Sequence, residues 1–225
     1  MRPLALLRPE PGWSVSAAAA RAMGVEVIGH PLFAAQAVAW TPPRETFDAL
    51  LVGSAAVFRH GGRGLADLSL LPVHAVGEAT AEAASAAGFS VSRTGEGGLQ
   101  ALLDAAQGET TRYLRLGGEE RVLLAPHAGQ TLAEVTVYRM VPQPLQLEFA
   151  ADLGRRRPLV AMHSAAAARQ FAGEVDRLQI ARRDLTLLAL GPRIAEAAGP
   201  GWQALHLADA PSNAALLAKA AALCK

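Results

Sequence analysis

Basic and small residues recur at the ends of the expected strands, which is where α/β proteins bind their ligands. Small residues let a ligand approach the backbone, and the helix after each strand offers unpaired N–H groups and a positive dipole end. Such positions suit carboxylates or phosphates, although serines and threonines there also serve as ordinary helix caps. The candidate binding residues are Arg8, Ser54, Gly77, Thr80, Arg115, Gly117, Ser164, Gly191 and Arg193.

Tyr138 is the best candidate for a general acid, because no other residue stands out as an acid or base. It lies in an expected strand, where a tyrosine more commonly serves packing. His163 and Ser164 are neighbours, but adjacent strand residues point to opposite faces, so the pair does not predict a nucleophile and its base.

Motifs of several other enzyme classes are missing. Val52 and Ala56 flank Gly53-Ser54 and break the Gly-x-Ser-x-Gly pattern of a nucleophilic serine. The phosphate loop of nucleotide hydrolases does not occur either. The six histidines lack the spacing of metal ligands, so we expect no metal site.

The composition indicates a folded protein that has no net basic field to attract nucleic acid or an anionic membrane, although a local cluster of arginines can still hold an anionic small molecule. Hydrophobic residues make up 51% of the 225 residues and charged residues 18%, which argues against disorder. The formal net charge is +1, so neither nucleic acid nor a membrane surface is an expected partner. Arg8 and Pro9 interrupt the apolar residues 4–7, which excludes a signal peptide or membrane span there. Cys224 is the single cysteine, which fits a reducing compartment, and we expect a cytoplasmic protein.

Short apolar runs alternate with helical stretches along the whole chain, the pattern of a parallel sheet covered by helices. The expected strands are residues 4–7, 25–28, 47–52, 73–76, 113–116, 135–140, 159–162, 185–190 and 203–207, with a further strand that starts at residues 89–91 and an extended segment at residues 38–43. The expected helices are residues 14–23, 79–87, 99–106, 194–198 and 214–223, with further helices that start near residue 55 and end near residue 171.

An internal repeat connects the two halves of this pattern. Residues 47–59 align with 157–171, and residues 73–84 align with 187–198. Two copies of one α/β unit predict two similar domains. The alternative is that strand–helix patterns recur in any α/β protein.

With these motifs in this order, the chain resembles the uroporphyrinogen-III synthase family. The resemblance extends over nearly the whole chain. It depends on the order and spacing of the matching segments, because no single segment is diagnostic. The matching segments are LLRPEPG at 6–12, MGVEVIGHPL at 23–32, FDALLVGSAAVF at 47–58, VHAVGEATAEAASAAGF at 73–89, YLRLGGEE at 113–120, VTVYR at 135–139, HSAAAARQF at 163–171, LALGPRIAEAA at 188–198 and DAPSNAALLAKA at 209–220.

The resemblance implies an α/β fold with two flavodoxin-like parallel-sheet domains joined by a two-stranded β ladder. Domain one would be discontinuous and hold residues 1–34 and 143–225. Domain two would hold residues 39–137, and residues 35–38 and 138–142 would form the linker ladder.

The resemblance also implies the family's reaction. Hydroxymethylbilane is cyclised to uroporphyrinogen III with loss of water and inversion of ring D, and no cofactor or metal takes part. The substrate's eight carboxylates suit a cleft of arginines and helix N-termini between the domains. By resemblance, Tyr138 donates the proton to the departing hydroxyl, and Ser54, Thr80 and Ser164 are the hydroxyls of the cleft. We expect a monomer, with hydroxymethylbilane synthase as a candidate protein partner.

The sequence departs from the family pattern at three turns. Gly53 stands where a threonine is common, and Ala165 replaces a proline. Arg193 and Ile194 follow Gly191-Pro192, where the family usually carries a threonine, and Arg193 becomes a candidate carboxylate ligand. Two other functions therefore stay open: a non-catalytic module of the same fold that binds an anionic tetrapyrrole or a protein partner, and a bilobal receptor for a sugar or amino acid.

Overall fold

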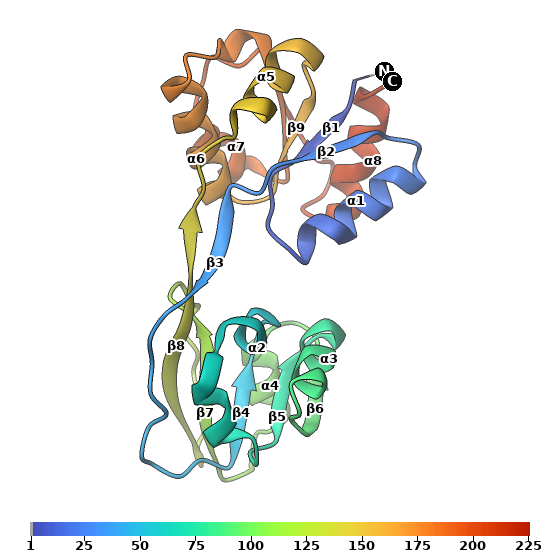
Figure 1. The fold of residues 1–225 in the computed structure, drawn as a ribbon. Helices are drawn as coiled ribbons and strands as arrows, with labels where there is room; N and C mark the ends of the chain where they lie inside the picture. Colours follow the sequence, from blue (N-terminus) through green and yellow to red (C-terminus); the bar gives the residue numbers. More distant parts are fainter. Residues whose placement is uncertain (1) are drawn as a thin grey trace. The chain divides into compact units, whose positions relative to one another are not determined.

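The computed structural model describes residues 2–225, which form two sheets of mainly parallel strands (Figure 1). The chain folds into two compact units: unit 1 is Met1–Ala34 with Pro142–Lys225, and unit 2 is Ala35–Val141. The chain passes between the units within two strands, β3 (Phe33–Ala37) and β8 (Gln130–Pro142), which are hydrogen-bonded neighbours. The expected fold class, two parallel-sheet domains with a two-stranded ladder, is confirmed.

The sheet of unit 1 has the flavodoxin strand order. Its order is β2-β1-β9-β10-β11, and each neighbouring pair is parallel. The order reverses between β1 and β9, and the carboxyl ends at such a reversal are where open α/β sheets bind ligands. The strands are β1 (Leu4–Leu6), β2 (Val27–Gly29), β9 (Leu159–Met162), β10 (Thr186–Ala189) and β11 (Ala204–Leu207).

Helices cover both faces of this sheet, so its central strands are apolar on both sides. In β1, Ala5 belongs to one buried cluster, whereas Leu4 and Leu6 belong to the cluster on the opposite face. The helices are α1 (Gly12–Ala22), α5 (Leu147–Arg156), α6 (Ala165–Arg177), α7 (Pro192–Ala198) and α8 (Asn213–Leu223).

The sheet of unit 2 has the order β3-β8-β7-β4-β5-β6, in which β8 through β6 are parallel. Its order reverses between β4 and β7, which places a second potential ligand site there. Its other strands are β4 (Ala49–Val52), β5 (Val73–Val76), β6 (Val91–Gly95) and β7 (Thr111–Gly118), and its helices are α2 (Ala56–His60), the 3₁₀ helix Gly62–Leu68, α3 (Glu78–Ala86) and α4 (Leu99–Ala105).

The two sheets are cyclic permutations of one arrangement. Strands β8, β7, β4, β5 and β6 of unit 2 occupy the sheet positions of β2, β1, β9, β10 and β11 in unit 1. The repeated segments start at β4 and β9, the first strand after the reversal in each sheet. Ser54 and Ser164 therefore stand at matching turns, and so do Gly77 and Gly191.

Helix α5 was not expected from the sequence. Its buried side chains are Phe149 and Leu153, a single pair four residues apart, while Leu147 is exposed. Gly154 disfavours a helix, but the segment is amphipathic, with its buried pair on one side and charged residues on the other. The helical pattern was therefore present in the sequence, and packing of the buried pair on the core stabilises the helix.

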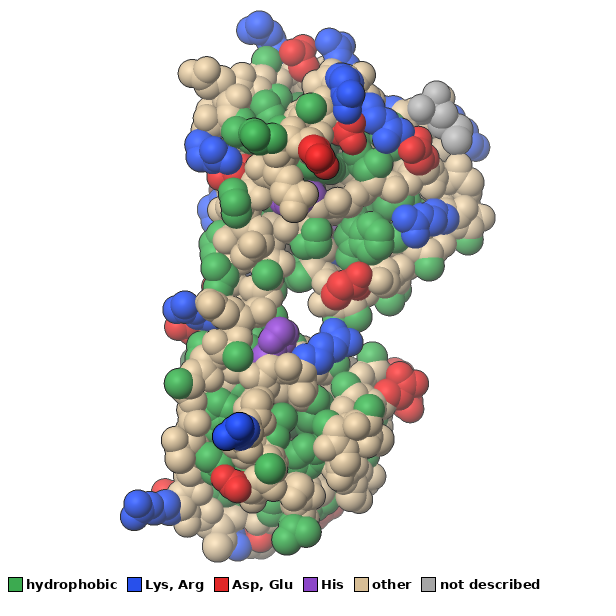
Figure 2. Space-filling model, viewed as in Figure 1, with side chains coloured by type: hydrophobic (Ala, Val, Ile, Leu, Met, Phe, Trp, Pro, Cys, Tyr) green, Lys and Arg blue, Asp and Glu red, His purple; other side chains and the backbone are tan. Residues whose placement is uncertain are grey.

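The surface carries mixed charge. On the face shown in Figure 2, basic and acidic side chains are interspersed, with hydrophobic side chains between them. This agrees with the near balance of 21 basic and 20 acidic residues. Within residues 2–225, no helix is both long and apolar enough to cross a membrane.

Candidate active site

A cavity of about 430 Å³ lies in unit 2 at the carboxyl ends of β4 and β7, where the strand order reverses. This is the place where an open parallel sheet binds its ligand. The cavity walls come from five parts of unit 2: the turn after β4, the end of β5, the start of α4, the end of β7 with the residues after it, and β8. Its polar and glycine residues are Gly53, Ser54, Gly97, Gly98, Gln100, Arg115, Gly117, Gly118, Glu120, Arg121 and Tyr138.

A β-bulge places Tyr138 over the end of β7. Gly117 pairs with Thr136 but Gly118 pairs with Tyr138, so Val137 is an extra residue on β8. Bulges of this kind re-aim side chains and recur beside active sites. A Cβ on Gly118 would lie 2.9 Å from Cε2 of Tyr138, so only glycine lets the ring lie this close.

The Tyr138 side chain is half-buried and packs against the apolar core of unit 2. Its ring centroid lies 6.2 Å from that of His60. Its hydroxyl has no hydrogen-bond partner among residues 2–225. The phenol is therefore available to a ligand, as a proton donor must be.

Two arginines share one carboxylate at this cavity. Arg115, only 5% exposed, donates from Nη1 to Glu134 Oε1 at 2.6 Å and to the Val122 carbonyl at 2.8 Å. Arg121 places its Nη1 at 3.6 Å from Glu134 Oε2. It also donates from Nε to the Gly118 carbonyl at 3.1 Å, and from Nη2 to the Thr136 hydroxyl.

Arg115, Arg121 and Glu134 together carry one net positive charge, and Glu120 adds a negative charge at the cavity wall. In addition, Nε of Arg115 is buried and has no partner among the described residues. A buried donor without a partner costs about 1–3 kcal/mol, which a carboxylate or a water would recover. The group of Arg115, Arg121 and Glu134 can therefore bind an anion.

The structure brings four of the expected residues together: Ser54, Arg115, Gly117 and Tyr138 all line this cavity. The Ser54 hydroxyl accepts a hydrogen bond from the Ala56 N–H at 3.2 Å, which still leaves its own O–H able to donate.

Gly77 and Thr80 lie elsewhere in unit 2, at the start of α3. The Gly77 N–H already donates to the Gly95 carbonyl at 2.9 Å. Thr80 is 5% exposed, so its side chain packs inside unit 2. Neither residue lines the cavity of unit 2.

Arg121, Glu134 and Gln100 are the site residues that the sequence reasoning missed. Glu134 comes 19 positions after Arg115 and meets it only because β7 and β8 pair in parallel with these residues in register. Alternation along β8 offered a signal for Glu134 and Thr136, which are two residues apart and share a face of the strand, but the bulge at Val137 ends this alternation before Tyr138.

The expected residues of unit 1 divide between two places. Gly191 and Arg193 line a cavity of about 390 Å³ at the start of α7, together with Ala165 and Pro211. Ser164 caps α6, because its hydroxyl accepts from the Ala167 N–H at 3.1 Å.

Arg8 belongs to a polar cluster at the strand reversal of unit 1. Its Nη1 donates to the Ser16 hydroxyl at 3.0 Å and to Asn213 Oδ1 at 3.4 Å. The His163 Nε2 lies 3.0 Å from the same Asn213 oxygen. Burial lowers the pKa of Arg8, and no carboxylate within residues 2–225 pairs with it. The strand reversal of unit 1 is therefore electropositive, and its polar side chains largely hydrogen-bond to one another.

Burial also lowers the pKa of His163 to about 4, although its hydrogen bond to Asn213 acts in the opposite direction and the positive charge of Arg8 adds to the lowering. His163 is therefore neutral near pH 7. Within residues 2–225, no group of three or more His, Cys, Asp or Glu side chains is arranged to hold a metal ion.

Comparison with known proteins points to one family. A family model described as "Uroporphyrinogen-III synthase HemD" matches residues 14–218. The uroporphyrinogen-III synthetase of Helicobacter pylori is 18% identical with a TM-score of 0.65, and the match covers 99% of this chain and 100% of that one. The wild-type synthase of Thermus thermophilus is 19% identical with a TM-score of 0.43, over 98% of this chain and 97% of that one. No curated protein matches the chain at a significant level. The likeness to the Helicobacter structure concerns the fold alone.

Proposed function

Because the chain belongs to the uroporphyrinogen-III synthase family, we propose that the cavity of unit 2, with Tyr138 in its wall, is part of the site where this enzyme cyclises hydroxymethylbilane. The family closes this linear tetrapyrrole with loss of water and inversion of ring D. The product, uroporphyrinogen III, feeds tetrapyrrole biosynthesis. The observation that carries the proposal is the free phenol of Tyr138 beside a buried cationic group at the strand reversal of the sheet.

The proposed chemistry begins with the hydroxyl of the hydroxymethyl group. As the C–O bond breaks, its electron pair leaves with the oxygen, and Tyr138 donates a proton so that water departs. The remaining carbon is part of an electrophilic azafulvenium cation, which the electron-rich pyrrole stabilises. Ring D then attacks this carbon with the α-carbon that already bears its methylene bridge. That bridge bond breaks and forms again at the other α-carbon of ring D, which inverts the ring, and the proton lost from this second carbon restores the phenol.

Positioning is the protein's second task. The chain of four pyrroles must be folded so that attack occurs at the carbon that leads to inversion, which is a proximity effect. We propose that Arg115 and Arg121 hold carboxylate arms of the substrate in unit 2, with Ser54 and the backbone of Gly117 beside them. Arg8, Ser164, Gly191 and Arg193 are the proposed contacts in unit 1, and Gly77 and Thr80 would contribute through the N-terminus of α3.

We further propose that the protein works as a cytoplasmic monomer that takes its substrate from hydroxymethylbilane synthase. The lone Cys224 supports a reducing compartment, because the sequence holds no second cysteine with which it could form an internal disulfide. Light scattering on a sizing column would test the monomer.

Isomer analysis tests the reaction directly. Hydroxymethylbilane is supplied to the purified protein, the product is oxidised to porphyrin, and the type I and type III isomers are separated. We expect the type III isomer in excess. Spontaneous closure without inversion gives type I, so a product that contains type I alone would exclude the synthase activity.

Arg115→Met tests the cationic group. We expect KM for hydroxymethylbilane to rise roughly ten- to a hundredfold with a smaller change in kcat, because a hydrogen bond to a charged group contributes about 1.5–3 kcal/mol. Steady-state kinetics measures both values. Arg112→Met is the matched control, since Arg112 is the second residue of the same strand, is exposed and binds Asp48 and Thr46 instead. Equal KM values in both variants would contradict a binding role for Arg115.

A further inference from the structure

Residues 119–129 connect the parallel strands β7 and β8 without a helix or a strand. Parallel neighbours are usually joined by a helical crossover. Here the connection runs beside the cavity instead, and it contributes Glu120, Arg121, Val122 and Leu124 to the cavity wall. Backbone hydrogen bonds fix the two ends of the segment: the Glu119 N–H donates to the Tyr138 carbonyl at 3.0 Å, and the Gly129 carbonyl accepts from the Thr111 N–H at 3.1 Å. Between these ends, side chains hold it against the cavity.

The first half of the segment is held by the arginines of the site itself. Arg115 donates to the Val122 carbonyl, and Arg121 donates back to the Gly118 carbonyl. These bonds place the backbone of residues 118–122, but they do not reach the second half of the segment.

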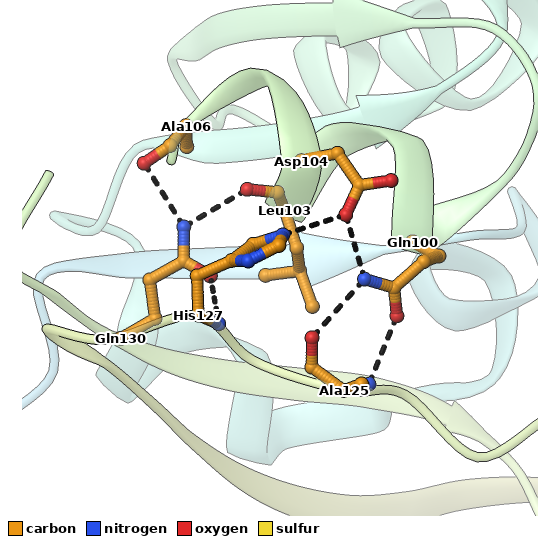
Figure 3. A network of polar contacts seen from close by, with 7 residues as sticks. All are labelled: Gln100, Leu103, Asp104, Ala106, Ala125, His127 and Gln130. Atoms are coloured by element: carbon orange, nitrogen blue, oxygen red, sulfur yellow. Dashed lines mark hydrogen bonds and ion pairs between the residues drawn. The ribbon is translucent and has the colours of Figure 1, made fainter. Parts of the chain in front are cut away.

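The second half is fastened to α4 by side-chain amides (Figure 3). Gln100 binds both backbone groups of Ala125: its Nε2 donates to the carbonyl at 3.1 Å and its Oε1 accepts from the N–H at 2.9 Å. The Nε2 of Gln100 also donates to Asp104 Oδ1 at 2.8 Å, and that oxygen lies 2.8 Å from His127 Nε2.

Gln130 completes the connection at the start of β8. Its Oε1 accepts from the His127 N–H at 3.0 Å, and its Nε2 donates to the carbonyls of Leu103 and Ala106 at 2.9 and 3.0 Å. These carbonyls belong to the last turn of α4, where a helix leaves carbonyl groups without partners. Gln130 is 7% exposed, so its amide is fully used inside the protein.

We propose that Gln100 and Gln130 are positioning residues, which hold residues 119–129 against α4 and thereby keep the wall of the substrate cavity in place. This inference rests on the proposed function of the cavity. Helix α4 also contributes Leu99 and Gln100 to that wall, so the amide contacts join two of its parts. Without them the segment would sample other conformations, and the enzyme would bind substrate less often in a productive state.

Hydrogen exchange and kinetics together test the proposal. In Gln100→Ala we expect the amide of Ala125 to exchange roughly tenfold faster, because its hydrogen-bond acceptor is lost. We expect KM to rise about fivefold or more and kcat to change less, since Tyr138 is held by β8 and not by this contact. Gln107→Ala is the control, because Gln107 follows α4 and its exposed side chain lies outside the network.

Gln130→Met separates positioning from direct contact with substrate. Gln100 lines the cavity and could contact substrate, whereas Gln130 does not line it. A rise in KM in both variants would therefore mean that each acts by displacing residues 119–129. Unchanged exchange at Ala125 in Gln100→Ala would overturn the proposal, and so would faster exchange with an unchanged KM. Failure of the proposed site itself would appear differently, as normal kinetics of Arg115→Met and of Tyr138→Phe.

Discussion

Tyr138→Phe is expected to lower turnover by roughly a hundred- to ten-thousandfold, the range of general acid catalysis. The variant removes only the hydroxyl. The ring can still pack over Gly118 and in the apolar core of unit 2, and no partner among residues 2–225 loses a hydrogen bond. The change should therefore appear in kcat with an unchanged unfolding transition. Single-turnover kinetics, with isomer analysis of the product, measures the effect.

Ser54→Ala and Thr80→Ala are the comparison variants for Tyr138. Each removes at most one hydrogen bond, so each should reduce turnover by less than about tenfold. If Tyr138→Phe turned over substrate at the wild-type rate, the tyrosine would be a packing residue. Catalysis would then rest on the folding of the substrate, with backbone N–H groups such as those of Gly117 and Gly191 holding its carboxylates.

Stability should decline in mild acid because of His163. Its pKa is about 4 in the folded protein, against a usual value of 6.5. Between these two pKa values the imidazole is protonated in the unfolded chain but not in the folded protein. The free energy of unfolding therefore falls as pH decreases from about 7 toward 4. The full difference corresponds to about 3 kcal/mol in the free energy of unfolding, of which partial exposure will remove some.

Urea unfolding at several pH values measures this loss, and His163→Gln isolates it. Glutamine keeps an N–H that can reach Asn213 but does not titrate, so the variant should lose less stability between pH 7 and 5 than the wild type does. Acidic residues such as Asp48, whose pKa Arg112 lowers, contribute below this range in both proteins. Parallel stability curves for the two proteins would mean that His163 is not responsible.

The sequence by itself determined most of the secondary structure, because the signals are local. The apolar run at β9, the largely apolar run at β5 and the cap at Ser212 could be identified without knowledge of any distant contact. The order of such segments carried the resemblance to the family and the internal repeat. Residue type and placement at strand ends were sufficient to select Arg115, Gly117, Ser54 and Tyr138 as candidates for one kind of site.

Only the tertiary structure decided which of these residues contact one another, and which already have hydrogen-bond partners within the protein. Strand register brings Glu134 to Arg115, and a bulge puts Tyr138 over Gly118. The Gly77 N–H is taken by Gly95 of a neighbouring strand. Arg8 is bound to Asn213, which is 205 positions away in the sequence. Strand pairing and side-chain partners depend on residues far apart in the chain, so a pattern within ten or fifteen residues holds no information about them.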